Sequence, residues 1–245
     1  MKKNIFVVSL IILFSMLLVA CGQKSEAYTV GTDATFPPFE MMDNDKNLIG
    51  FDIELMDMIA EEAGIEIEFK NTSFDALLAG MTTCQYDMAA SAITITEERG
   101  KTMTFSDPYI NAGQAVVVAI DSDITGVEDL NGEIIGGQLG TTGLMEAEAV
   151  PDATVKTYDS YELAFQDVIN GQAAAIIIDY PTALAFVEIN NDTLKVVGEP
   201  FTEEYYGIAM CKTDTELQEK VNAALSTLIA EGKVAELEQK WLAGE

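Results

Sequence analysis

Alternating and periodic apolar residues predict strands and helices along the first part of the chain. Apolar residues alternate with polar ones along residues 28–32 and again along 65–69, which predicts two half-buried strands. Between them, apolar side chains recur at helical spacing along residues 51–63. This helix should end at Gly64, because glycine readily adopts the left-handed conformation that closes helices. Ser73 is expected to cap a second, shorter helix.

The second part of the chain has longer apolar runs. Strands are predicted at residues 113–120, 134–135, 155–158, 173–178, 194–197 and 206–210. Helical patterns follow at 144–149, after Ser160, and after a capping box at Thr213–Glu216. Strands that alternate with helices predict an α/β fold.

The N-terminal segment has the pattern of a secretory leader. Lys2 and Lys3 precede an almost wholly apolar run that ends in Leu18-Val-Ala-Cys21. Such a short run reads as a leader rather than a membrane span. The last four residues resemble a bacterial lipobox, which implies cleavage before Cys21 and lipid attachment to its thiol. An ordinary leader with an incidental cysteine is the alternative.

Cys84 and Cys211 are the other two cysteines. In an extracytoplasmic protein they could form a disulfide, but a single possible pair makes no framework. Their separation in space cannot be read from the sequence, and we expect two free, partly buried thiols.

Composition excludes several functions. The formal net charge of −28 makes nucleic acid an improbable partner, since phosphate binding requires basic patches. The chain has no histidine, which excludes a cysteine–histidine nucleophile, and no metal-ligand spacing occurs. We therefore expect no catalytic residue, no metal and no cofactor.

Residues 87–109 carry the most specific polar pattern. An apolar start leads into a hydroxyl-rich turn with Ser91 and Thr94, followed by Arg99, the only arginine of the chain. Arginine has a planar fork that grips a carboxylate through two hydrogen bonds, which lysine lacks. Arg99 is thus a candidate carboxylate receptor; a stray surface arginine is the alternative.

Three other segments place polar groups at strand ends. Asp33 opens a proline-stiffened loop that also carries Phe36. Asp179 ends a continuous apolar run of the kind found in buried parallel strands, so it should either contact a ligand or cap the next helix. The glycine-rich turn at 136–143 presents backbone N–H groups suited to an anion, although it is neither a Walker nor a dinucleotide motif.

Two motifs, in this order, resemble those of the polar amino-acid-binding lipoproteins of ABC importers. Gly50-Phe-Asp-Ile-Glu-Leu fits the signature that opens the first helix of that family. Ala92-Ile-Thr-Ile-Thr-Glu-Glu-Arg99, followed by Phe105-Ser-Asp-Pro-Tyr109, fits its second signature. The resemblance to this family, bacterial solute-binding protein family 3, runs from about Tyr28 to Leu242.

The resemblance implies the type II periplasmic-binding-protein fold. This is an α/β fold of two lobes, each with a mainly parallel central sheet flanked by helices, joined by two hinge crossings. Residues 1–20 would be the lipoprotein signal peptide and 21–27 a tether. The first lobe would contain 28–113 and 204–245, and the second 114–203.

The implied function is capture of a polar L-amino acid in the cleft between the lobes and delivery to an ABC importer. Glutamine, a basic amino acid and cystine all remain open as the ligand. The partners would be this amino acid, the membrane subunits of the importer and the membrane itself, through palmitate or another lipid on Cys21. The protein would act outside the cytoplasm as a monomer.

Position by position, the family motifs assign roles to the charged residues. Arg99 would hold the α-carboxylate of the ligand, assisted by the backbone of Thr94 and the N–H groups around Thr141 and Thr142. Asp179 would accept hydrogen bonds from the α-ammonium group.

The remaining roles concern the ligand side chain. Phe36 and Phe74 would sandwich it, and Asp33 would lie near its far end. Residues at three further positions would tune selectivity: Ser91, Ala92 and Gln138.

Two alternative functions use the same fold. One is an enzyme similar to cyclohexadienyl dehydratase, which would need a carboxylate or a lysine as its general acid. The other is a ligand-sensing protein that acts through a separate signalling receptor.

Overall fold

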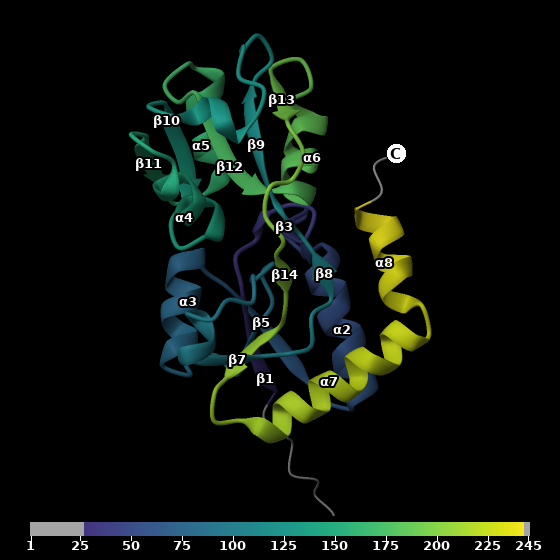
Figure 1. Ribbon diagram of the computed structural model, residues 1–245. Helices are drawn as coiled ribbons and strands as arrows, with labels where there is room; N and C mark the ends of the chain where they lie inside the picture. Colours follow the sequence, from purple (N-terminus) through teal and green to yellow (C-terminus); the bar gives the residue numbers. More distant parts are fainter. Residues whose placement is uncertain (1–26, 243–245) are drawn as a thin grey trace, which may run out of the picture.

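A computed structural model describes residues 27–242 and places them in two lobes, each built on a five-stranded sheet (Figure 1). The predicted leader at 1–20 and the predicted lipid site at Cys21 lie outside the described residues. Within 27–242, no helix is both long and apolar enough to cross a membrane.

The first sheet draws its strands from both ends of the described chain. Its spatial order is β5 (Ile67–Asn71), β1 (Tyr28–Thr32), β6 (Met88–Ala89), β15 (Ala209–Cys211) and β7 (Met103–Phe105). Only β15 runs against the others. The helices of this lobe are α2 (Phe51–Ala63), α3 (Phe74–Thr82), α7 (Thr215–Ala230) and α8 (Lys233–Trp241), with a 3-10 turn, η1, at Arg99–Lys101.

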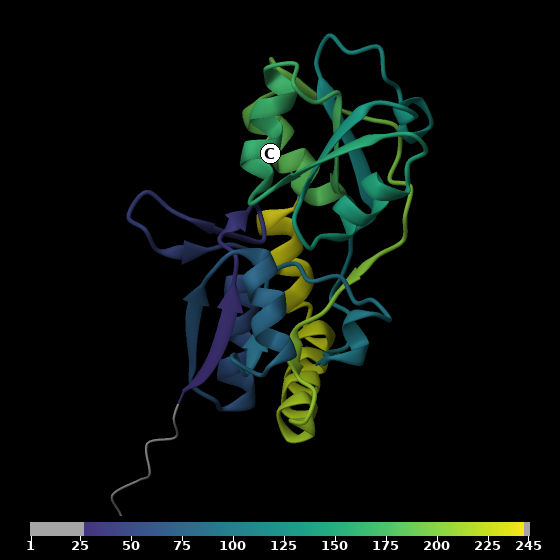
Figure 2. The same cartoon turned by 90° about the vertical axis from the view of Figure 1, so that its left-hand side faces the viewer.

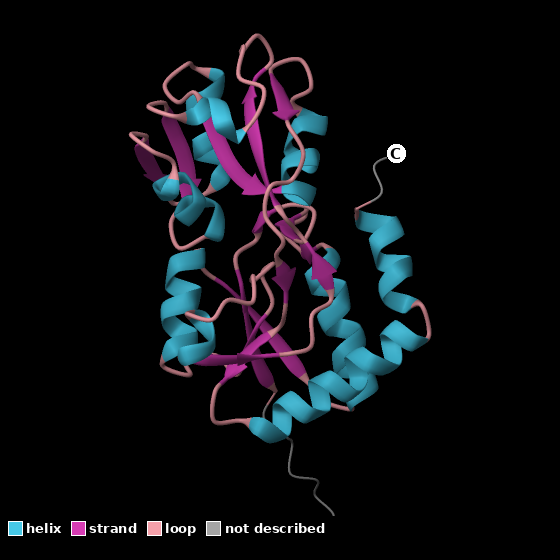
Figure 3. Ribbon diagram, viewed as in Figure 1, coloured by secondary structure: helices cyan, strands magenta, loops and turns pink. Residues whose placement is uncertain are grey.

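The second sheet repeats this pattern of directions. Its order is β11 (Thr154–Tyr158), β10 (Ile134–Gln138), β12 (Ala175–Asp179), β9 (Gln114–Ala119) and β13 (Leu194–Val197). Only β9 runs against the others. Its helices are α4 (Thr142–Ala149), α5 (Tyr161–Ile169) and α6 (Tyr180–Ile189), and η2 (Val127–Leu130) is a 3-10 turn. Figure 3 shows these helices packed around the strands.

Two extended segments join the lobes. β8 (Ile110–Asn111) pairs antiparallel with β14 (Tyr205–Tyr206), and both lie between the two sheets (Figure 1). The chain therefore crosses into the second lobe before β9 and returns before β15.

A small meander adjoins the first sheet. β2 (Thr35–Phe36), β3 (Glu40–Met42) and β4 (Leu48–Ile49) pair in sequence, and the peptide bond between Pro37 and Pro38 is cis. Its loop projects from the side of the first lobe in Figure 2. The sequence predicts only a stiff loop here, because strands this short leave no periodic signal.

The predicted apolar patterns explain the main elements. All five residues of β12 are buried, as expected of a strand covered on both faces. Helix α2 buries its apolar face and ends at Gly64, which has a φ of 64°. The N–H groups at this left-handed position bond back to the last helical turn, so the predicted helix end is confirmed.

Three local predictions were wrong. Ser73 immediately precedes α3, but its side chain makes no capping hydrogen bond. The single strand predicted at 206–210 is split into β14 and β15, because the chain leaves one pairing partner and joins another. Helix α7 is capped by Asp214, whose carboxylate accepts the N–H of Leu217 at 3.0 Å, and not by the predicted box at Thr213.

The expectation of two free thiols was also wrong. Cys84 and Cys211 form a disulfide, with their Cα atoms 5.2 Å apart. Cys84 lies between α3 and β6, and Cys211 ends β15, which pairs with β6. The antiparallel pairing of two strands far apart in sequence brings the thiols together, and this pairing carried no sequence signal.

Candidate functional site

One cavity lies between the lobes, and its walls bring together every site residue expected from the sequence. Glu40 is the one additional lining residue. The lining consists of Asp33, Phe36, Glu40, Phe74, Ser91, Ala92, Thr94, Arg99, Gln138, Thr141, Thr142 and Asp179. The cavity is the strongest candidate for a binding site.

Strand direction explains why these residues meet. Asp33 follows β1, Ser91 lies just past β6, and Gln138 and Asp179 end β10 and β12. The carboxyl ends of the parallel strands of each sheet face the gap between the lobes. In open α/β sheets, ligands bind in the crevice at these ends.

Arg99 forms part of the first-lobe wall and is 7% exposed. Its Nη1 donates to the Thr94 carbonyl at 2.7 Å and its Nη2 to the Gly140 carbonyl at 3.0 Å. Its Nε is buried without a partner among the described residues, and the guanidinium lies 5.6 Å from the centre of the Phe74 ring. Burial lowers the pKa of Arg99, opposed by the charge of Asp179. A guanidinium nevertheless stays charged in proteins.

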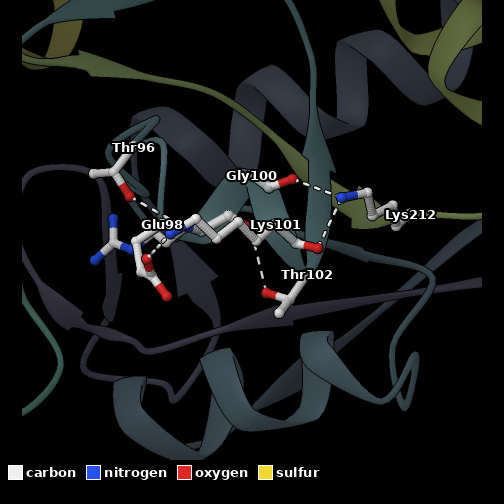
Figure 4. A network of polar contacts seen from close by, with 7 residues as sticks. Thr96, Glu98, Gly100, Lys101, Thr102 and Lys212 are labelled. Atoms are coloured by element: carbon white, nitrogen blue, oxygen red, sulfur yellow. Dashed lines mark hydrogen bonds and ion pairs between the residues drawn. The ribbon is translucent and has the colours of Figure 1, made fainter.

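The backbone of η1 is held from the solvent side. The Arg99 N–H donates to Thr96 Oγ1 at 3.1 Å, and Lys212 donates to the carbonyls of Gly100 and Lys101 at 2.9 and 2.7 Å (Figure 4). These bonds fix the turn, so the arginine side chain extends toward the cavity from a rigid base.

Asp179 provides a negative charge on the second-lobe wall. It is 4% exposed, and its Oδ1 accepts a hydrogen bond from Gln114 Nε2 at 3.0 Å. Burial, and next the charge of Glu204, raise the pKa of Asp179 to about 7, and the charge of Arg99 opposes this shift. Asp179 precedes α6, but its side chain makes no capping bond.

Asp33 is a fully engaged carboxylate. It accepts from the Thr35 hydroxyl at 2.9 Å, the Phe74 N–H at 3.0 Å and Gln138 Nε2 at 2.9 Å. Burial raises the pKa of Asp33, while these hydrogen bonds act in the opposite direction.

Glu40 is not among the site residues expected from the sequence. It is fully buried, and Ser91 Oγ donates to its Oε1 at 2.9 Å. Burial raises the pKa of Glu40 well above its usual range, and the neighbouring charge of Asp52 raises it further. Glu40 lies opposite Phe36 across the β2–β3 pair. In the sequence, Glu40 is marked only by its position four residues after Phe36, which was an expected site residue.

The second-lobe wall presents the start of α4. Thr141 caps this helix: its Oγ1 accepts the Leu144 N–H at 3.1 Å and donates to the Gln138 carbonyl at 2.8 Å. The Thr141 N–H also donates to the Gln138 carbonyl, at 3.3 Å, so one of the two expected anion-binding N–H groups already has a partner.

Several contacts cross the cavity. Arg99 reaches the Gly140 carbonyl, Gln138 reaches Asp33, and the hydroxyls of Thr94 and Thr142 are 3.4 Å apart. The lobes are therefore in contact around the site, and the conformation is a closed one.

The aromatic residues Phe36 and Phe74 line the same cavity, and each is 7% exposed. The ring of Phe36 lies 5.8 Å from that of Tyr161. Within residues 27–242, no cluster of three or more cysteine or carboxylate side chains is arranged to hold a metal ion.

Comparison with known proteins gives consistent matches over nearly the whole chain. The model of the bacterial extracellular solute-binding proteins, family 3, matches residues 28–244. An L-cystine-binding protein of Escherichia coli (strain K12) is 33% identical over 219 residues, which is 88% of this chain and 82% of that protein.

Two further matches concern arginine. An arginine-binding extracellular protein of Bacillus subtilis (strain 168) is 33% identical over 239 residues, covering 93% of each chain. The solved structure of an ancestral arginine-binding protein bound to arginine has a TM-score of 0.85 and 41% identity, over 89% of this chain and 98% of that one.

Proposed function

Because the chain belongs to the bacterial extracellular solute-binding proteins, family 3, we propose that it captures a polar L-amino acid between its lobes and delivers it to an ABC importer. The function requires a site for a zwitterion and a conformation that encloses it. Arg99 and Asp179 supply opposite charges in the cavity, and the lobes are closed around it.

The observation that carries this proposal is the placement of Arg99 and Asp179 on opposite walls of one buried cavity. An amino acid carries a carboxylate and an ammonium group on one carbon, and each needs a fixed opposite charge. Breaking a buried ion pair by removing one partner costs about 3–5 kcal/mol, so the two charges together select a ligand with both groups.

Arg99 has donors to spare for this role. Its guanidinium has five N–H groups, of which the Thr94 and Gly140 carbonyls take two. The Nε–H and the other two remain for the ligand carboxylate, which can accept two parallel hydrogen bonds from such a fork.

The other carboxylates favour a cationic side chain. Once Arg99 and Asp179 are paired with the two charges on the α-carbon, Asp33 and Glu40 still line the cavity. Their placement suits arginine, lysine or ornithine better than a neutral side chain. The match to an arginine-bound structure supports the same class.

Closure would occur about the paired segments β8 and β14. We place the lobe boundaries near residues 113 and 203, so that each crossing is one of these segments. A ligand that contacts both lobes favours the closed form, which the importer would recognise. A lipid on Cys21 would hold this monomer at the outer face of the membrane.

The test is a thermal-shift screen of the purified protein against the twenty amino acids, ornithine and cystine. A ligand at a hundred times its Kd stabilises the native state by about 2.7 kcal/mol. We expect the largest shift from a basic amino acid. A screen without any shift, repeated by calorimetry with the same result, would overturn the proposal.

An enzyme similar to cyclohexadienyl dehydratase is the second candidate. Glu40 favours it, because a buried carboxyl with a raised pKa is suited to general-acid chemistry. Incubation with arogenate or prephenate distinguishes the two: an aromatic product identifies an enzyme, and binding of a basic amino acid without turnover identifies a binding protein.

A further inference from the structure

The orientation of the Ser91 hydroxyl defines what Glu40 can do. The Asp33 N–H donates to Ser91 Oγ at 3.0 Å, so the oxygen acts as an acceptor there. The hydroxyl proton then points to Glu40 Oε1, 2.9 Å away. Oε2 of Glu40 is buried without a partner in the described part of the chain. Glu40 thus lines the cavity with one carboxylate oxygen that accepts a hydrogen bond and one that has no partner among the described residues.

Two neighbouring carboxylates, Asp33 and Asp52, accept more hydrogen bonds than Glu40 does. Asp33 accepts three hydrogen bonds, and Asp52 accepts from the Ala92 N–H at 2.7 Å and from the Tyr109 hydroxyl. Hydrogen bonds to a carboxylate stabilise its charged form. Glu40, with a single donor, is the least supported carboxylate of the three.

The charges around Glu40 also favour its protonated form. Asp52, Asp33 and Asp179 all raise its pKa through their charges, and its burial raises it most. Two buried phenols, Tyr109 and Tyr206, are also close enough for the charge of Glu40 to act on them. Arg99 is the cation on the cavity wall, and the ligand carboxylate would neutralise it.

We propose that Glu40 keeps a proton when the cavity holds a neutral side chain and releases it when a cationic side chain binds. This inference rests on the proposed amino-acid function. The O–H bond of the carboxylic acid breaks, the proton leaves to the solvent buffer, and the ligand's ammonium or guanidinium group replaces its charge. With a neutral amide side chain, the protonated Oε2 instead donates a hydrogen bond.

One cavity could then accept both ligand classes without leaving an unpaired charge. Burying an ionised carboxylate beside an amide would be costly, and so would burying a cation beside a neutral acid. Exchange of a single proton avoids both costs. The preference for a cationic ligand over a neutral analogue should therefore increase with pH.

The experiment measures proton release by titration calorimetry of the full-length protein in two buffers of different ionisation enthalpy. The ligands are L-arginine and L-citrulline, which have similar shapes and differ in charge. Asp179 responds to the α-ammonium group of both, so its contribution cancels in the difference. We expect arginine to release about one proton more than citrulline. The arginine-to-citrulline affinity ratio should rise by up to about tenfold per pH unit while Glu40 titrates.

Two variants identify the source of the proton. Glu40→Gln, which cannot ionise, should abolish the difference in proton release and the pH dependence of the ratio. Asp33→Asn should retain the difference, because the proton is assigned to Glu40 and the three hydrogen bonds that Asp33 accepts stabilise its own charged form. A difference that persists in Glu40→Gln assigns the proton to another group and overturns the inference.

The wild-type measurements decide the matter even if a variant fails to fold. Equal proton release for arginine and citrulline overturns the proposed release of a proton from Glu40 but leaves the proposed function standing. Binding of citrulline alone at pH 8 has the same consequence. If arginine alone binds, release of no proton by arginine overturns the exchange. Failure of every amino acid to bind overturns the proposed function and this inference together.

Discussion

The carboxylate of Asp52 accepts the backbone N–H of Ala92 at 2.7 Å and thereby joins the start of α2 to the turn that forms the cavity wall. Ala92 has a φ of 46°, in the left-handed region that alanine rarely occupies. The Tyr109 hydroxyl donates to both oxygens of Asp52, at 2.7 and 2.8 Å. A single buried carboxylate therefore holds the turn of residues 91–94 in place from behind.

Replacement of Asp52 should destabilise the protein and weaken ligand binding together. Asp52→Ala leaves the Ala92 N–H and the Tyr109 hydroxyl buried without an acceptor, at about 1–3 kcal/mol for each group. Tyr109→Phe removes a donor and should cost less. Urea unfolding with each variant measures the change, and a loss below about 0.5 kcal/mol for Asp52→Ala would contradict this role.

Arg99→Lys should weaken amino-acid binding at least tenfold, a loss of about 1.4 kcal/mol or more, and leave the fold intact. Lysine keeps the charge but loses the planar fork. Calorimetry measures the affinity. Lys101→Ala is the matched control, because Lys101 lies on the same 3-10 turn and its exposed side chain pairs with Glu98. An unchanged affinity in Arg99→Lys would refute the carboxylate assignment.

Asp179→Asn should reduce affinity by a similar factor, since it removes the charge that pairs with the α-ammonium group. The amide oxygen can still accept the hydrogen bond from Gln114, so the local structure should persist. Circular dichroism checks the fold and calorimetry the affinity. Binding at the wild-type level would show that Asp179 does not contact the ammonium group.

The ligand-free protein should lose stability as pH rises from about 4 to 7. The pKa of Asp52 is raised to about 6 and that of Asp179 to about 7, so the native state binds more protons than the unfolded chain in this range. Each such group then contributes up to about 1.4 kcal/mol per pH unit. Denaturant unfolding at several pH values measures the slope. Asp179→Asn should flatten it near pH 7, and a slope that is unchanged in this variant would contradict the shift.

Reduction of the disulfide should lower the melting temperature without changing ligand affinity. Cys84 and Cys211 are 127 residues apart in sequence, and loss of a native disulfide typically costs about 2–5 kcal/mol. The cavity residues lie at the opposite ends of the strands. Calorimetric melting and binding of Cys84→Ser/Cys211→Ser test this, and a large loss of affinity would refute it.

The sequence predicted the cavity better than the links that hold it together. Asp33, Arg99 and Asp179 line the cavity, and the sequence singles them out because each lies at the end of a strand or belongs to a recognisable motif. Glu40 was missed because its position depends on the pairing of β3 with β2, two strands too short for a periodic signal. The disulfide was missed because it depends on the pairing of β6 with β15. Local patterns predict elements, whereas contacts between distant segments depend on the whole fold.

The place of β15 in the first sheet has a consequence for how the protein is made. β15 lies between β6 and β7 and joins β7 to the rest of the sheet, and it is one of the last strands to be synthesised and exported. The second sheet, by contrast, is complete once residue 197 has emerged. The second lobe should therefore fold first outside the membrane, while the sheet of the first lobe still lacks β15. Chaperones and proteases of the cell envelope would encounter that incomplete sheet. The cavity would form in the last step of biogenesis.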